Sequence, residues 1–274
     1  MSGMAPEPEK LLALGVEVAR RAGATARRMR TDGVSGVRTK STETDVVTAA
    51  DRAVERQMVA ALRAARPKDT MLGEEYGAAA AGAGRSSGGV RWIIDPIDGT
   101  VNYLYGLPLY AVSLAVEVDG EVVAGVVHNA ATGEEWTAIR GAGAYRDGRR
   151  LTGSDATDLS QALIATGFGY DAARRAHQAA VLTGLITRVR DIRRIGAASI
   201  DLCLTAEGLL DAFYEKGLNA WDHAAGGLVA TEAGLRVTGL SGAPPGPDLV
   251  LAAPPALYDE LHDLLVDLDA AGGP

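Results

Sequence analysis

The feature that most narrows what this chain can fold into is an apolar run that leads into two acids, at residues 92–100. The β-branched residues of that run are typical of a buried strand. Pro96 cannot donate a hydrogen bond to a neighbouring strand, so we expect the strand to stop there and to leave Asp95 and Asp98 at its carboxyl end. Ligands bind at that end of the strands in α/β folds. Both carboxylates should therefore point into one cleft.

Gly99 and Thr100 follow the two acids and should open a helix or a 3₁₀ turn. The free backbone N–H groups at such a start suit an anionic phosphate oxygen. The alternative is purely structural: Asp98 caps the next helical turn, and Gly99 allows the backbone to bend there. Taken alone, the segment leaves both interpretations open.

Two further segments add carboxylates. Residues 72–75 place Glu74 and Glu75 after a short apolar run, and Asp222 stands at the start of a helix of apolar and small residues. In isolation, adjacent glutamates are usually solvated and an aspartate before a helix is usually a cap. Together with the first two acids, they form an all-oxygen set without paired Cys or His, which suits Mg²⁺ rather than Zn²⁺. Several carboxylates in one cleft would repel one another unless cations lay between them.

The net charge and the single cysteine restrict the kinds of binding partner and the cellular compartment that we expect for this chain. The chain has 27 basic and 35 acidic residues, a net charge of -8, which argues against nonspecific binding to nucleic acid or to an anionic membrane. Cys203 lies in an apolar stretch and cannot form an internal disulfide, which fits a reducing cytosol. The first ten residues lack the features of a signal peptide, and no apolar run approaches the roughly 20 residues that cross a bilayer. We expect a cytoplasmic protein.

Hydrophobic periodicity predicts the elements of the first half. Helical spacing over residues 7–30 and 45–66 predicts two long helices, with a hairpin or loop at 33–40 between them. Residues 77–89 are rich in Gly, Ala and Ser, which is typical of a mobile surface insertion. Strand-like runs with turn signals over residues 110–146 predict an antiparallel meander.

The second half changes to alternating strands and helices. Its strands are expected at residues 162–166, 189–192, 212–214 and 249–252. A final helix is expected at 255–268, and the alternation is typical of an α/β lobe. We therefore predict an α+β protein in two parts. Residues 1–153 would form an antiparallel-sheet lobe with paired helices and most of the acids, and residues 154–274 an α/β lobe with Asp222 and the substrate-recognition segment.

In order along nearly the whole chain, the motifs resemble those of the inositol monophosphatase family. The matching segments are Lys40, TDVVTAAD at 44–51, GEE at 73–75, DPIDGTVN at 95–102, GLPLYAVS at 106–113, WDHAAG at 221–226 and EAG at 232–234. TGFGY at 166–170 and RRIG at 193–196 are similar to the bacterial inositol-1-monophosphatase branch. The resemblance implies a layered αβαβα sandwich, a homodimer, and a Mg²⁺-dependent, lithium-sensitive phosphatase.

The resemblance also implies two to three Mg²⁺ ions per active site. The groups it assigns to the two main ions are Glu74, Asp95, the carbonyl of Ile97, Asp98 and Asp222. Asp95 would touch both ions. A third, weaker ion would use Glu74 and lie near a mobile loop that contains Lys40. His223 follows a ligand, but we interpret it as a packing residue.

For the chemistry, the resemblance places Thr100 and Glu74 beside the attacking water and has Asp51 orient the Thr100 hydroxyl. No covalent phosphoenzyme is needed. The residues implied for substrate binding are Asp98, Gly99, Thr100, Gly196, Ala198 and Glu215, the last as an acceptor for inositol hydroxyls. In isolation, Asp51 could be a surface acid, Thr100 a capping hydroxyl and Glu215 a solvated strand-end charge.

One position departs from the family pattern. The usual Gly-Ser/Thr-Ala-Ala reads GAAS at 196–199, so the hydroxyl expected at Ala197 is missing, which bears on the choice of substrate more than on phosphatase activity. The leading interpretation is a phosphoric monoester hydrolase that acts on myo-inositol 1-phosphate or a related phosphorylated polyol. The alternatives are histidinol phosphate, fructose 1,6-bisphosphate or adenosine 3′,5′-bisphosphate as substrate, or a binding partner of transcription or ribosome-assembly machinery.

Overall fold

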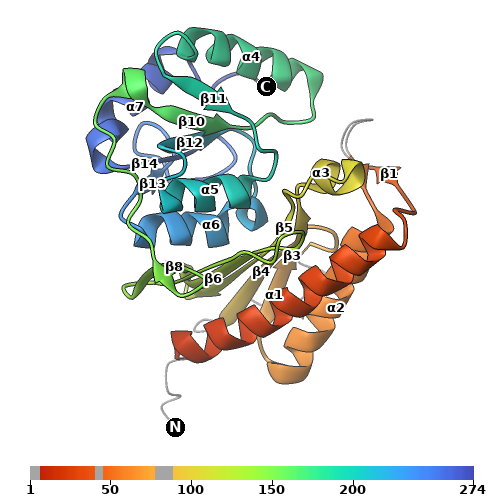
Figure 1. Ribbon diagram of the computed structural model, residues 1–274. Helices are drawn as coiled ribbons and strands as arrows, with labels where there is room; N and C mark the ends of the chain where they lie inside the picture. The colour runs from red at the N-terminus through yellow and green to blue at the C-terminus, as the bar shows by residue number, and fades with distance from the viewer. Residues whose placement is uncertain (1–6, 41–45, 78–88) are drawn as a thin grey trace.

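The computed structural model describes residues 7–40, 46–77 and 89–274 of the chain. Its first two long helices are α1 (Pro8–Thr31) and α2 (Ala49–Ala65), as the periodicity predicted. Apolar side chains at helical spacing along both helices are buried against the larger of the two main sheets (Figure 1). The amphipathic pattern therefore determines both the helices and the face that they cover.

The second helix begins later than predicted. Thr48 caps it, because its hydroxyl accepts from the N–H of Ala50 while the Asp51 carboxylate accepts from the N–H of Thr48. The residues just before the cap, β2 (Val46–Val47), instead pair with β1 (Arg38–Thr39) as an antiparallel hairpin. The predicted mobile insertion and the start of the TDVVTAAD motif fall largely on residues outside the described ranges.

The larger sheet has seven strands in chain order. They are β3 (Thr70–Gly73), β4 (Val90–Asp98), β5 (Ala111–Val118), β6 (Glu121–Asn129), β7 (Glu135–Ile139), β8 (Gly143–Arg146) and β9 (Arg149–Arg150). Only β3 and β4 pair in parallel within this sheet, so the predicted antiparallel meander is confirmed. Along β4 the side chains alternate, with Trp92 and Ile94 packing in the same cluster as α1 and α2 and Ile93 in the cluster on the opposite face.

Strand β4 does not end at Pro96. Asp95 pairs with Ser113 and Asp98 pairs with Ala111, with a register irregularity between them, so the strand continues through the proline. The prediction was wrong because a proline is tolerated where a bulge already interrupts the ladder. Gly99, in the left-handed region at φ 86°, then turns the chain into the short helix α3 (Thr100–Tyr105).

The smaller sheet and the remaining helices complete five layers. In sheet order its strands are β11 (Asp191–Arg193), β10 (Leu163–Thr166), β12 (Ala212–Glu215), β14 (Val250–Ala253) and β13 (Arg236–Thr238). Helices α5 (Ala198–Glu207) and α6 (Ala220–Glu232) lie between the two sheets, whereas α4 (Ala172–Leu185) and α7 (Pro255–Asp267) cover the outer face of the smaller one (Figure 1). The predicted αβαβα sandwich is confirmed.

Small residues bring the middle layer close to its neighbours. A Cβ added at Gly226 of α6 would stand 2.9 Å from the Cβ of Leu202 on α5, so only glycine permits this approach. One buried cluster joins Ile93 of the larger sheet to Leu202 and to Phe213 of the smaller one. The division into two lobes between residues 153 and 154 remains a prediction. The buried cluster just described contains residues from both sides of that boundary. Within the described ranges, no helix is both long and apolar enough to cross a bilayer.

Candidate active site

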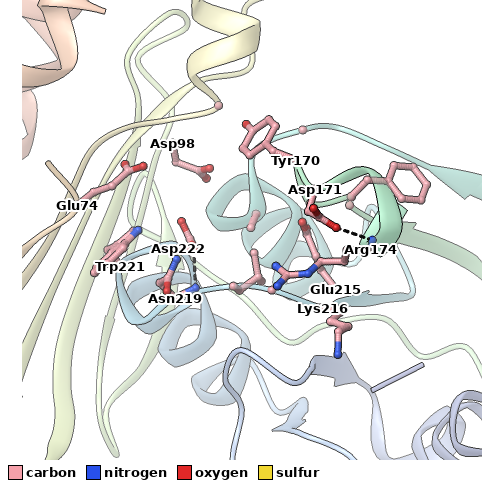
Figure 2. Close-up of a pocket in the computed structure, with 18 of the residues that line it drawn as sticks. Glu74, Asp98, Tyr170, Asp171, Arg174, Glu215, Lys216, Asn219, Trp221 and Asp222 are labelled. Carbon is pink, nitrogen blue, oxygen red and sulfur yellow. Dashed lines mark hydrogen bonds between the residues drawn. The ribbon is translucent and has the colours of Figure 1, made fainter. Parts of the chain in front are cut away.

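A cavity of about 630 Å³ opens where the ends of β3 and β4 meet the segments that follow β10 and β12. Figure 2 shows Glu74, Asp98 and Asp222 on one side of it, and Asp171, Glu215 and other polar residues on the opposite side. The cavity therefore has an acidic end and a mixed polar end. The sequence motifs that lay more than 100 residues apart converge on it.

Of the acids at the first end, Asp95 and Asp98 are buried, whereas Glu74 and Asp222 are half-buried. Asp95 is 1% exposed and Asp98 is 8% exposed. Burial raises the pKa of Asp95 well above its usual range, and the nearby charges of Glu74, Asp98 and Asp222 raise it further. Burial followed by the charges of Glu74 and Asp98 does the same to the pKa of Asp222. The free protein therefore holds these carboxylates together against their mutual repulsion.

Hydrogen bonds hold Asp95, Asp98 and Asp222 in place. Asp95 Oδ1 accepts from the N–H of Ile97 at 3.0 Å, and Asp222 Oδ2 accepts from the N–H of Asn219 at 2.6 Å. Asp222 thus also caps its own helix, as the structural alternative supposed. Asp98 Oδ2 accepts from both the N–H and the hydroxyl of Ser199, at 2.8 and 2.5 Å.

Lys40 reaches into the acidic end from the β1 hairpin. Its Nζ lies 2.8 Å from Oε1 of Glu74 and 2.5 Å from Oε1 of Glu75. Burial alone would lower the pKa of Lys40, but the two ion pairs outweigh it and raise that pKa. Glu55 of α2 stabilises the turn at residues 74–76, because its carboxylate accepts hydrogen bonds from the N–H groups of Glu75 and Tyr76 at 2.8 and 3.2 Å.

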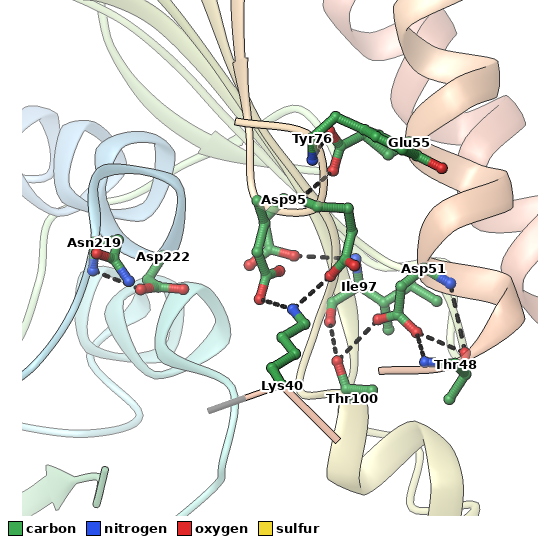
Figure 3. A network of polar contacts seen from close by, with 12 residues as sticks. Lys40, Thr48, Asp51, Glu55, Tyr76, Asp95, Ile97, Thr100, Asn219 and Asp222 are labelled. Atoms are coloured by element: carbon green, nitrogen blue, oxygen red, sulfur yellow. Dashed lines mark hydrogen bonds and ion pairs between the residues drawn. The ribbon is translucent and has the colours of Figure 1, made fainter. Parts of the chain in front are cut away.

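Thr100 and Asp51 form a buried pair beside the acids (Figure 3). The Thr100 hydroxyl lies 2.9 Å from Asp51 Oδ1 and 3.1 Å from the carbonyl oxygen of Ile97. Either oxygen can accept the hydrogen bond from its single proton. Asp51 Oδ2 accepts from the N–H and the hydroxyl of Thr48, at 2.8 and 2.6 Å. The capping box that starts α2 therefore also locks the orientation of Asp51.

The donor set at this end fits divalent cations. Within the described part of the chain, no three His, Cys, Asp or Glu side chains already form a group that could hold a metal ion. The acids nevertheless offer only oxygen donors, the kind that Mg²⁺ and Ca²⁺ prefer, and the charges of Glu74, Asp98 and Asp222 all raise the pKa of Asp95. His223 is next to Asp222 in the first turn of α6, but it is not among the residues that line the cavity, so its interpretation as a packing residue stays a prediction.

The mixed polar end is built around Glu215 at the end of β12. Its carboxylate lies against Gly167, where an added Cβ would stand 2.0 Å from Oε2, so a side chain at that position would displace it. Burial raises the pKa of Glu215 to about 8, with Arg194 lowering it and Asp98 raising it. A carboxyl that holds its proton at neutral pH can donate as well as accept. Gly196 and Ala198 line the same cavity.

Three features of this cavity were not predicted from the sequence. The segment from Gly167 to Arg174 forms a wall, and Arg194 places a guanidinium among the acids. The third is the pair of bonds from Ser199 to Asp98. The missing hydroxyl at Ala197 was the signal that could have led to Ser199, which lies two residues further along.

Comparisons with known proteins identify the family of this chain. The inositol monophosphatase family model matches residues 7–269. A Mycobacterium tuberculosis relative named inositol-1-monophosphatase SuhB is 44% identical over 271 residues, covering 93% of each chain. A Pseudomonas aeruginosa relative named Nus factor SuhB is 42% identical over 201 residues, covering 72% of this chain and 73% of that one. The solved structure of Mycobacterium tuberculosis SuhB superposes with a TM-score of 0.81 at 39% identity, covering 97% of this chain and 99% of that one.

Proposed function

This chain belongs to the inositol monophosphatase family, and from that premise we propose that it hydrolyses a small phosphate monoester with the help of Mg²⁺. Membership of the family supports phosphatase activity. The observation that carries the proposal is the convergence of Glu74, Asp98 and Asp222 on one cavity. Asp95 is buried close to all three, and the Thr100–Asp51 pair lies beside them. That set combines cation ligands with a group able to handle a proton.

Two to three Mg²⁺ ions would be held by the buried oxygens of the acidic end. The groups that would hold them are the carboxylates of Glu74, Asp95, Asp98 and Asp222 and the carbonyl oxygen of Ile97. When bound, the cations offset the charge of the phosphoryl oxygens and acidify the attacking water. Lys40 already contributes one positive charge to Glu74 and Glu75 in the free protein.

Thr100 would accept a proton from the attacking water and pass its own hydroxyl proton to the Asp51 carboxylate, to which it is hydrogen-bonded. Its own proton points to Asp51 or to the Ile97 carbonyl, so an oxygen lone pair of the hydroxyl remains for the water. Asp51 cannot rotate away, because Thr48 holds its other oxygen. Glu74, in the turn that follows the neighbouring strand β3, would act as the second acceptor. The backbone N–H groups of Gly99 and Thr100 would bind the phosphate.

The organic part of the substrate would lie at the mixed polar end. Glu215 offers a carboxyl that can both donate to and accept from hydroxyl groups, and the backbone at Gly196 and Ala198 leaves room beside it. A polyol carries many hydroxyls that need such partners. We therefore propose myo-inositol 1-phosphate as the substrate, with a homodimer as the working state.

A substrate panel at fixed Mg²⁺ tests this proposal, with released phosphate as the readout. We expect the highest kcat/KM for myo-inositol 1-phosphate among that compound, histidinol phosphate, fructose 1,6-bisphosphate and adenosine 3′,5′-bisphosphate. A clear preference for one of the other three compounds would show that the proposed substrate is wrong but that the chain is still a phosphatase. No release from any of them would refute the phosphatase proposal.

A second function is favoured by one observation, the Nus factor name of the Pseudomonas aeruginosa relative. We propose that this chain could also bind transcription machinery through its surface, independently of the acids. Co-sedimentation of the wild type and of Asp95→Asn with purified bacterial RNA polymerase tests this. Equal binding of both proteins would support a role that is separate from catalysis. No binding of either protein would refute this second function.

A further inference from the structure

The start of helix α5 has an unusual cap. Ala197 occupies the N-cap position and has no side-chain oxygen to bond the free N–H groups of the first turn. The carboxylate that reaches them instead is that of Asp98, which belongs to the larger sheet and lies 101 residues earlier in the chain. A predicted metal ligand and the helix start are therefore bound to each other.

Ser199 makes that connection with two donors. Its N–H and its hydroxyl both bond Asp98 Oδ2, at 2.8 and 2.5 Å. Ser199 is fully buried and Asp98 is nearly so, which strengthens hydrogen bonds to a charged oxygen. Two donors on one oxygen restrain the carboxylate more than one donor would, because they fix its rotation as well as its position.

We propose that Ser199 is a positioning residue that orients Asp98 for cation binding, in place of the hydroxyl that the family pattern puts at position 197. The inference rests on the proposed function, because it requires Asp98 to hold Mg²⁺. Ser199 touches neither substrate nor cation in this scheme. It acts through the Asp98 carboxylate alone.

The simpler alternative is that Ser199 and Asp98 only stabilise the start of α5. In that case, loss of the hydroxyl would lower stability and leave cation affinity unchanged. Thr205 provides a matched control, since it lies on the same helix, is equally buried, and donates its hydroxyl to the carbonyl oxygen of Asp201 at 2.8 Å. Thr205→Val removes a buried hydroxyl from α5 without touching Asp98.

The experiment measures Mg²⁺ binding to the purified full chain by calorimetric titration, together with the melting temperature without metal. Ser199→Ala should weaken Mg²⁺ binding about 10-fold, as expected for losing one hydrogen bond to a charged group while the N–H bond remains. Ser199→Cys keeps the size of the side chain with a weaker donor and should fall between Ser199→Ala and the wild type. Thr205→Val should bind Mg²⁺ within about 2-fold of the wild type.

Kinetics separate orientation from general damage. At saturating Mg²⁺, Ser199→Ala should recover most of the wild-type kcat. Unchanged Mg²⁺ affinity in Ser199→Ala, or an equal loss in Thr205→Val, would overturn the inference. A wild-type protein that does not bind Mg²⁺ would instead refute the proposed function, so the two failures are distinguishable.

Discussion

Replacing Gly73 by alanine should disturb the site through a residue that does not line it. Gly73 is the last residue of β3, immediately before Glu74, and the carboxylate of Glu55 packs directly against it. An alanine Cβ would stand 2.0 Å from Glu55 Oε1 and 2.5 Å from its Cδ, well inside contact distance. Glu55 is fully buried on α2, so it has little room to retreat. Either the carboxylate or the strand end must move.

The size of the effect follows from what the movement breaks. Glu55 accepts two backbone hydrogen bonds from the 74–76 turn, and each bond to a charged group contributes about 1.5–3 kcal/mol. Burial raises the pKa of Glu55 to about 7, so only about half of the protein has this group ionised at neutral pH. We therefore expect Gly73→Ala to lower the free energy of unfolding by about 2–3 kcal/mol, which includes the cost of overpacking.

A double-mutant cycle with Glu55→Ala isolates the contact. Because Glu55→Ala removes the side chain that alanine would meet, Gly73→Ala should cost at least about 1.5 kcal/mol less in that background. Gly227→Ala on α6 is the control, since its Cβ would meet only Val237 at 3.8 Å. Urea unfolding of the four proteins and the control at pH 7 gives the values. If the two changes add without coupling, the steric argument is refuted.

Four further predictions concern the acids and the ions. Asp95→Asn should abolish Mg²⁺-dependent phosphate release while circular dichroism shows a folded protein; appreciable activity would refute its assignment to both ions. Glu215→Ala should lower kcat/KM for myo-inositol 1-phosphate about 10- to 100-fold and hardly change that for p-nitrophenyl phosphate, whereas equal losses would place it in the catalytic machinery. Li⁺ at millimolar concentration should inhibit uncompetitively with substrate, and unchanged activity would count against exchange of the ion held by Asp98 and Asp222. Without metal, the raised pKa values of Asp95, Asp98 and Asp222 mean that the folded state binds more protons than the unfolded state. The melting temperature of the metal-free protein should therefore fall as pH rises from about 5 to 8, and added Mg²⁺ should oppose that fall. A melting temperature that rises with pH in the absence of metal would contradict this.

The sequence predicted the elements well where one physical pattern dominated. Helical spacing located α1, and turn signals between strand-like runs located the meander β5 to β8. It failed where two effects competed. At Pro96 a bulge lets the strand continue through the proline, which would otherwise interrupt the ladder. At Thr48 a capping box starts α2 a few residues after the beginning of the predicted apolar pattern.

The candidate site shows the same limit. The acids could be named from their motifs, because each occupies a fixed place relative to a strand end or a helix start. The residues that orient them could not, since those contacts depend on which segments meet in three dimensions. Glu55 supports the turn after Gly73 across 20 residues, and Ser199 supports Asp98 across 101. Neither has a local sequence signal, although the missing hydroxyl at Ala197 hinted at the second.

The proposed catalytic role of the acids has one direct test, phosphate release from myo-inositol 1-phosphate by metal-free protein to which Mg²⁺ is added stepwise. We predict no release before addition, a saturable rise in rate with Mg²⁺ for the wild type, and no rise for Asp95→Asn at any concentration. Release by the wild type that does not depend on Mg²⁺, or an equal response from Asp95→Asn, would contradict the account.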